Sequence, residues 1–348
     1  MTLVDNYLKL LPKRIFRLSK DPNKLRRFSA IGDNSLLYEI FKREIKSDPK
    51  VFSIIGSIDF DSNRKIENYY IENNNVDLIC INVSEHKLNE FDNHSLNTIN
   101  LKIPYVILIN EPELENQKRM YFPYWLLASK IFTELDNNNS SLPKKYYVSC
   151  LSRNPRKERI YNFVKLKQLS FFSEMYITFY QKHPFTNEII NNDNIVEIDN
   201  DIKELFFKDF KSLPLELNLN EQLIVMSIDN PGYQESMLNI ITETYHDTLY
   251  LSEKTFKPIR AQQLFLMCGP ANSIKHLRDL GFDVFDDIID HTYYDSESDW
   301  EKRIIKMHEL LVEIYYDIPT MYKETKRRRN NNRKHLLNFR YNLLDKFL

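Results

Sequence analysis

Residues 248–270 read TLYLSEKTFKPIRAQQLFLMCGP and carry the signals of a helix between two strands. The apolar residues at the start predict a strand that ends at Leu251, and Ser252 is a favourable first residue for the helix that follows. Pro258 predicts that this helix is kinked or begins a few residues later. Residues 264–268 then form a second apolar run, and the order strand, helix, strand is typical of a parallel sheet in an α/β protein.

The same alternation extends over the rest of the chain. Further buried strands are predicted at Val51–Ile55, Val76–Val83, Tyr105–Ile109, Tyr146–Leu151, Met175–Tyr180 and Leu223–Ile228, and helices at Ser35–Ile45, Phe122–Phe132, Arg156–Phe172 and Trp300–Tyr316. A polar linker at residues 136–143 has the composition of turns. We therefore predict two Rossmann-like parallel-sheet domains facing a cleft, at residues 1–140 and 141–322, followed by a basic C-terminal helix at 323–348.

Composition excludes several classes of protein. The 348 residues include 42 % hydrophobic residues, enough for a core, but only five glycines. Neither G-x-G-x-x-G nor the P-loop sequence occurs, so a phosphate site must use cations and a helix N-terminus. The three cysteines lie far apart in apolar runs, which indicates core residues in a reducing compartment. No apolar run is long enough to span a membrane, and we expect a cytoplasmic protein.

Basic residues are concentrated at the two ends. Residues 1–28 carry a net charge of +6 and residues 323–348 carry +7, so the remainder carries −14, because the whole chain carries −1. This asymmetry is compatible with an anionic partner, either nucleic acid or a peripheral membrane surface. A solvated helix face is the alternative explanation.

Two segments contain cations at positions where helices are predicted to begin. Arg153, Arg156 and Arg159 surround the start of the helix after the strand at 146–151. Lys254 and Lys257 lie in the first turns of the helix after Ser252, next to Glu253. Cations normally favour helix C-termini, so a bound phosphate would explain this arrangement. The alternatives are a solvent-exposed basic turn and a Glu253 that only stabilises the helix dipole.

These segments resemble the donor-binding signature of the α1,3/α1,4-fucosyltransferases, glycosyltransferase family ten. The resemblance rests first on Tyr250-Leu-Ser-Glu-Lys254 and on the strand Leu264-Phe-Leu-Met-Cys268. Tyr147-Val-Ser-Cys-Leu-Ser followed by Arg159 resembles the strand-plus-arginine segment of that family. Asn230-Pro-Gly-Tyr233 resembles its E-N-S segment, with residues 234–247 interpreted as an insertion that carries Glu243 and a surface His246. Viral glycosyltransferases are similar over Glu253–Pro258 and Leu277–Phe282.

The first predicted domain also resembles this family. Leu108-Ile-Asn-Glu-Pro-Glu113 is similar to its acidic loop, and Tyr121-Phe-Pro-Tyr-Trp125 to its aromatic segment. The resemblance implies a GT-B fold in which the first domain binds the acceptor. It also implies that Glu111 is the catalytic base, with Glu113 as its neighbour.

In the second domain, the resemblance implies a nucleotide-sugar donor site. Glu253 would bind the ribose, Lys254 and Arg159 would neutralise the diphosphate, and Tyr250 would line the pocket. The implied activity is inverting, metal-independent transfer of a sugar to a hydroxyl of a glycan, with GDP-fucose as one candidate donor and no cofactor. The sequence shows no D-x-D motif between strands and no clustered metal ligands, in agreement with that implication.

Two other functions remain open. One is a viral glycosyltransferase, in the host cytoplasm, that modifies a hydroxylated DNA base and uses the basic ends to follow phosphates. The other is an inactive module that binds a nucleotide sugar without transferring it. The presence of Glu253, Lys254 and Arg159 argues against this alternative, because an inactive site has no reason to keep mispaired charges. Calorimetry with a panel of nucleoside diphosphates tests whether the site binds at all.

Overall fold

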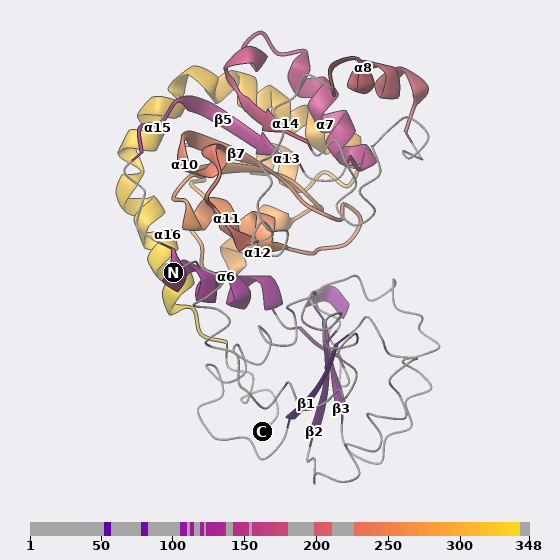
Figure 1. Ribbon diagram of the computed structural model, residues 1–348, viewed down its shortest axis with the longest axis vertical. Coiled ribbons are helices and arrows are strands. Elements are labelled where there is room, and N and C mark those ends of the chain that lie inside the picture. The colour runs from indigo at the N-terminus through magenta and orange to yellow at the C-terminus, as the bar shows by residue number, and fades with distance from the viewer. Residues whose placement is uncertain are drawn as a thin grey trace, which may run out of the picture. The chain divides into compact units, whose positions relative to one another are not determined.

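The computed structural model divides the chain into two units, one comprising residues 1–135 and 338–348 and the other residues 136–337. The structure describes residues 52–56, 78–82, 105–109, 112–114, 119–121, 123–136, 142–152, 155–179, 198–210 and 226–341. Each unit has its own parallel sheet of four strands (Figure 1). The predicted α/β class with two parallel sheets is confirmed.

The first sheet has the strand order β1-β2-β3-β4, so successive strands are neighbours. Its strands are β1 (Phe52–Gly56), β2 (Leu78–Asn82), β3 (Tyr105–Ile109) and β4 (Arg119–Tyr121). The first three are apolar runs that the sequence predicts, as in sheets covered on both faces. β4 was not predicted, because three residues with an arginine give no apolar run. The short helix η4 (Pro112–Leu114) follows β3, and α6 (Tyr124–Leu135) follows β4. The predicted helix 35–45 lies outside the described residues.

The second sheet has the order β6-β5-β7-β8, and every neighbouring pair is parallel. The strands are β5 (Tyr146–Leu151), β6 (Tyr176–Thr178), β7 (Ser236–Thr242) and β8 (Leu264–Cys268). The bounds of β5 and β8 are those that the sequence predicts. Because the strands are parallel, β5 and β7 end at the same edge of the sheet, and the segments after them are neighbours.

The interpretation of residues 234–247 as an insertion is wrong, because β7 is a central strand of the sheet. Ser236 and Asn239 interrupt its apolar pattern, and both are buried. The sheet accommodates Asn239 because its side chain donates to Ser149 Oγ at 3.0 Å on the neighbouring strand β5. Two other segments were predicted to be strands and are not: Met226–Ile228, the described part of the predicted strand 223–228, and Thr248–Leu251.

Helices surround the second sheet. They are α7 (Lys157–Lys167), η5 (Phe172–Glu174), α8 (Asn200–Phe210), α10 (Pro231–Gln234), α11 (Glu253–Arg260), α12 (Ser273–Asp279), α13 (Thr292–Asp295), α14 (Trp300–Ile314), η7 (Tyr315–Asp317), α15 (Ile318–Glu324) and α16 (Lys326–Asn338). In Figure 1, α14, α15 and α16 follow one another in an arc along this unit. α16 is the predicted basic C-terminal helix, and α7 ends five residues before the predicted Phe172.

The core of the second unit is formed by the strands and by the inner faces of these helices. Cys150 on β5 and Cys268 on β8 are buried and free, as expected of core residues, whereas the side chain of Cys80 lies outside the described residues. Among the helices that the structure describes, none combines the length and apolar character needed to span a membrane.

Candidate functional site

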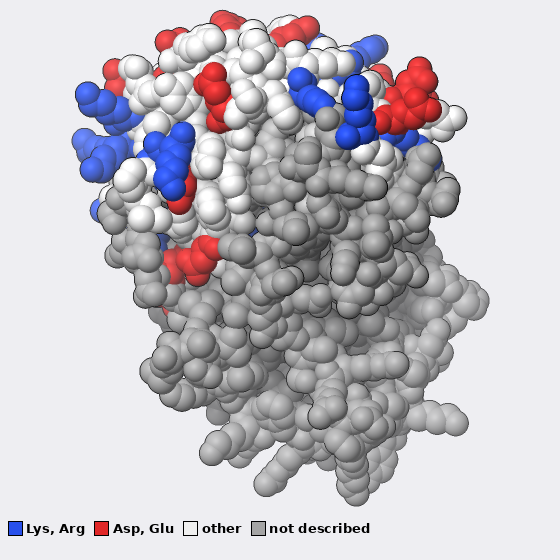
Figure 2. Space-filling view, turned by 45° about the horizontal axis from the view of Figure 1, so that its top comes forward, with Lys and Arg blue, Asp and Glu red and all other residues white. Residues whose placement is uncertain are grey.

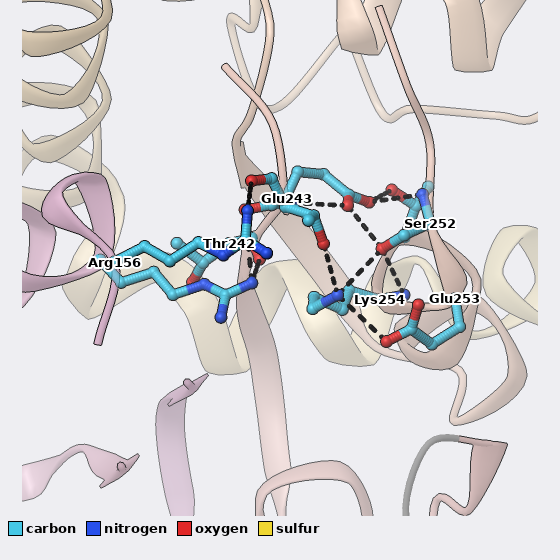
Figure 3. Close-up of polar contacts among 9 residues, drawn as sticks. Arg156, Thr242, Glu243, Ser252, Glu253 and Lys254 are labelled. Carbon is cyan, nitrogen blue, oxygen red and sulfur yellow. Dashed lines mark hydrogen bonds and ion pairs between the residues drawn. The ribbon is translucent and has the colours of Figure 1, made fainter. Parts of the chain in front are cut away.

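Two of the predicted cations meet at Thr244, in the loop after β7. Arg156, at the start of α7, donates from Nη1 to the Thr244 carbonyl oxygen at 3.0 Å. Lys254, in the first turn of α11, donates from Nζ to Thr244 Oγ1 at 3.0 Å. These two residues are almost a hundred positions apart, and the parallel strands bring them together at the carboxyl edge of the sheet (Figure 3).

α11 begins at Glu253, so a later start for this helix, which Pro258 made possible, is excluded. Ser252 has extended backbone angles, and its Oγ accepts a hydrogen bond from the Lys254 backbone N–H at 3.3 Å. This is the N-cap that the sequence predicts. Pro258 lies inside the helix without ending it, since the next two residues remain helical.

The Lys254 ammonium has three oxygen acceptors. Besides Thr244 Oγ1 they are Ser252 Oγ at 3.2 Å and Glu253 Oε1 at 3.0 Å. The side chain of Lys254 is 19 % exposed and that of Glu253 is 12 % exposed, so the ion pair is partly shielded from water. Burial acts to raise the pKa of Glu253, but the charges of Lys254 and Lys257 outweigh it and hold the pKa below its usual range. Glu253 is therefore ionised at neutral pH.

Arg159 is buried beneath the same loop. Its Nη2 lies 3.5 Å from the carbonyl oxygens of Thr242 and Glu243, at the end of β7. Burial lowers the pKa of Arg159 to about 10, and the charge of Arg156 adds to this effect. Arg159 nevertheless stays cationic at neutral pH and contributes positive charge to this edge of the sheet.

Aromatic rings border the cations. The exposed Arg156 guanidinium lies 5.6 Å from the centre of the Tyr245 ring, which contacts the Tyr250 ring edge-to-face at 5.1 Å. Tyr250 is buried. Lys257 is also buried, and its ammonium lies 5.4 Å from the ring of Tyr233 on α10. Tyr250 thus packs against the ring that borders Arg156, and the charge of Lys257 helps to lower the pKa of Glu253.

The remaining predicted site residues have a different status. Arg153 and Glu111 lie outside the described residues. Glu113 lies on η4 in the first unit and is exposed. Within the described part of the chain, no three His, Cys, Asp or Glu side chains are grouped so that they could hold a metal ion.

Glu243 is a member of the site that the sequence interpretation left undecided. It directly follows β7 and is 1 % exposed, and its carboxylate accepts hydrogen bonds from the loop and from α11. The sequence signal that could have identified Glu243 was its place directly after the apolar residues of β7. That segment was not predicted to be a strand.

His246 is buried, at 8 % exposure, so its interpretation as a surface residue is wrong. Burial, together with the charges of Arg303 and Arg159, lowers the pKa of His246 to about 3. A backbone group of Glu243 has a smaller effect and raises the pKa of His246, but neither ring nitrogen has a hydrogen-bond partner among the described residues. Arg303 on α14 holds this residue in place, because its Nη2 lies 3.3 Å from the His246 carbonyl oxygen.

The fold and the site define an α/β protein with a cationic site at the carboxyl edge of a parallel sheet. No protein-family model matches the chain, and no curated protein matches it either. Among solved structures, a crystal structure of an α1,3-fucosyltransferase is similar, with a TM-score of 0.38 and 10 % sequence identity. The similarity covers 86 % of this chain and 95 % of that one.

Proposed function

We propose that this protein is a glycosyltransferase that binds a nucleoside-diphosphate sugar in its second unit. The observation that carries the proposal is the meeting of Arg156 and Lys254 at Thr244. Parallel sheets bind ligands at the carboxyl ends of their strands, and a helix N-terminus with added cations favours phosphate. Here one cation is supplied by the helix after β5 and the other by the helix after β7.

Each group in the site has a role in this proposal. Arg156 and Lys254 bind the diphosphate directly, and the buried Arg159 adds positive potential beneath them. Glu253 is ionised and accepts hydrogen bonds from ribose hydroxyls, while Tyr250 supports the wall of the site through Tyr245. Arg153 and Lys257 provide further positive charge.

The proposed reaction is a displacement at the anomeric carbon of the sugar. The acceptor hydroxyl oxygen forms the new bond, the bond from the sugar to the diphosphate breaks, and the hydroxyl proton goes to a carboxylate. Glu111 is the proposed base, with Glu113 as its neighbour. The cations of the second unit stabilise the charge on the leaving diphosphate. The sequence resemblance to fucosyltransferases makes GDP-fucose the first donor to test and inversion at the anomeric carbon the expected outcome.

Calorimetry with GDP, UDP, ADP and CDP, with and without EDTA, tests donor binding. We expect one diphosphate to bind without a divalent cation. Lys254→Ala and Arg156→Ala should each weaken that binding roughly 10- to 100-fold, the range for one charge-assisted hydrogen bond. Lys275→Ala is the matched control, since Lys275 is an exposed lysine on α12 that pairs with Asp279. Undiminished binding by both site variants would contradict the proposal.

A transfer assay with the sugar form of the bound nucleotide tests the chemistry. Glu111→Gln should bind the donor as the wild type does but lose transfer, and Glu113→Gln should lose less. A wild-type protein that binds the donor, yet neither transfers nor hydrolyses it, would be a binding module and not an enzyme.

A further inference from the structure

The carboxylate of Glu243 has four hydrogen-bond donors around it. Oε1 accepts from the Ser252 backbone N–H at 3.0 Å and from Thr255 Oγ1 at 2.5 Å. Oε2 accepts from the Thr244 backbone N–H at 3.2 Å and from Ser252 Oγ at 2.5 Å. Glu243 therefore joins the end of β7 to the first turn of α11, because Glu243 and Ser252 are nine positions apart in the sequence.

This arrangement requires a carboxylate specifically. Each of the two oxygens receives one backbone N–H, and a backbone N–H cannot turn round to become an acceptor. In a glutamine, the amide NH₂ would face a backbone N–H whichever way the amide is oriented. Because Glu243 is buried, that conflict could not be relieved by water.

Glu243 also determines where the Lys254 ammonium lies. Ser252 Oγ gives its hydrogen to Glu243, which leaves its lone pairs for the Lys254 backbone N–H and for Nζ. Thr244, whose N–H is bound by Glu243, supplies the hydroxyl acceptor for the same ammonium. Two of the three oxygen acceptors of Lys254 thus belong to residues that Glu243 holds (Figure 3).

We propose that Glu243 is a positioning residue of the donor site, which fixes the Lys254 ammonium where it binds the diphosphate. This inference rests on the proposed function for its ligand. Its geometric content, the fixing of residues 244–255 by the Glu243 carboxylate, can be measured without any ligand.

The test compares Glu243→Gln with Thr255→Val in the full-length protein. Thr255→Val removes one donor to the same carboxylate, but Thr255 is not an acceptor of Lys254. We expect Glu243→Gln to weaken nucleoside-diphosphate binding by about tenfold or more, and Thr255→Val by less than about threefold. Adding Glu243→Gln to Lys254→Ala should cause no further loss, because both changes act through the same ammonium.

Amide hydrogen exchange provides the readout that needs no ligand. In Glu243→Gln, the N–H groups of Thr244, Ser252 and Lys254 should exchange faster, while those of β8 stay protected. If Glu243→Gln does not fold, Ser252→Ala replaces it, since that change removes the link from Glu243 to Lys254 through Ser252 Oγ and leaves Glu243 and its link through Thr244 in place.

The outcomes separate the two proposals. If the wild type binds no nucleoside diphosphate, the proposed function is wrong, and hydrogen exchange alone decides whether Glu243 positions α11. If the wild type binds, but exchange and affinity are unchanged in Glu243→Gln, the positioning role is overturned and the proposed function stands. Additive losses in the double variant would also overturn it, because Glu243 would then act independently of Lys254.

Discussion

Three arginines hold the backbone of the loop after β7. Arg156 donates to the carbonyl of Thr244, and Arg159 lies within reach of the carbonyls of Thr242 and Glu243. Arg303 approaches the carbonyl of His246. Carbonyl oxygens in an irregular buried segment must be satisfied, and a guanidinium can serve several of them at once. Two arginines assigned to phosphate binding from the sequence therefore also have a structural task.

Arg303 is buried, and among the residues that the structure describes its guanidinium donates only to backbone carbonyls. It is 2 % exposed, and it donates to the carbonyls of Gly269 at 2.8 Å and of Glu297. It thus joins the loops after β7 and β8 to the segment before α14. We expect Arg303→Met to lower the free energy of unfolding by about 2 to 4 kcal/mol, because buried carbonyls lose their donor.

Urea denaturation monitored by circular dichroism measures this change. Lys302→Met is the matched control, because Lys302 is the exposed neighbour on the same helix and should change stability by less than about 0.5 kcal/mol. If the two variants had equal free energies of unfolding, Arg303 would not be the residue that holds these loops together.

At the scale of elements, α16 explains part of the basic charge at the C-terminal end. Arg328 forms a two-pronged ion pair with Asp283 at 2.6 and 2.7 Å and a further one with Asp287 at 2.7 Å. Arg329 is buried, and its guanidinium lies 3.4 Å from the centre of the Tyr322 ring and donates to the Gln262 carbonyl. Both arginines make their contacts within the second unit. The basic run Lys326-Arg-Arg-Arg329 is therefore not a uniform anion-binding face. Among the described residues on the face shown in Figure 2, basic and acidic side chains are interspersed.

A pair of double variants separates the structural charges from the exposed ones. Arg328→Ala with Arg329→Ala should lower the free energy of unfolding by roughly 2 to 4 kcal/mol, since a buried guanidinium and an ion-pair network are lost. Lys326→Ala with Arg327→Ala removes the same charge from exposed positions of the same helix and should cost less than about 0.5 kcal/mol.

The same variants test whether α16 contacts nucleic acid. Binding through phosphates depends on the number of cations, so Lys326→Ala with Arg327→Ala should reduce the salt dependence of any DNA binding. If α16 serves only the fold, Lys326→Ala with Arg327→Ala should leave any DNA binding of the wild type, and its salt dependence, unchanged.

At the scale of the whole molecule, three buried histidines make stability depend on pH. Burial is the main cause that lowers the pKa of His246 and His308 to about 3 and that of His291 to about 4. In the unfolded chain a histidine has a pKa of about 6.5. Between these values the unfolded state binds more protons than the folded state, so stability is complete above about pH 7 and falls as the pH is lowered below 6.5.

We expect each of these histidines to lower the free energy of unfolding by about 1 kcal/mol at pH 5.5 relative to pH 7.5. The three together should lower it by roughly 3 to 4 kcal/mol. Urea denaturation at pH 5.5, 6.5 and 7.5 measures the loss above the range where carboxylates titrate. His276, whose pKa burial lowers to about 4, adds to the measured loss. His308→Gln, which can retain the contact of His308 Nε2 with Asn162 Oδ1 at 2.8 Å, should remove about 1 kcal/mol of the loss. A pH-independent free energy over this range would contradict the expectation.

The sequence predicted the local structure where a single signal was strong. β8 is a continuous apolar run, and β5 is apolar except for Ser149. Ser252 is a capping residue before acidic and basic residues, so these strands and the start of α11 follow from local chemistry. β7 was missed because Ser236 and Asn239 break its pattern. Only the neighbouring strand explains why a polar residue is accommodated there, since Ser149 provides the partner for Asn239.

The candidate site divides in the same way. Arg156, Arg159 and Lys254 were identified from the sequence because cations at helix N-termini are electrostatically unusual. Glu253 was identified from its place in the first helical turn and from the resemblance to fucosyltransferases. The meeting of Arg156 and Lys254 at Thr244, the burial of His246 and the four hydrogen bonds of Glu243 depend on parallel strands that bring distant segments to one edge. Local sequence determines which groups a segment offers, whereas burial and pairing arise between segments, and only the tertiary structure decides those.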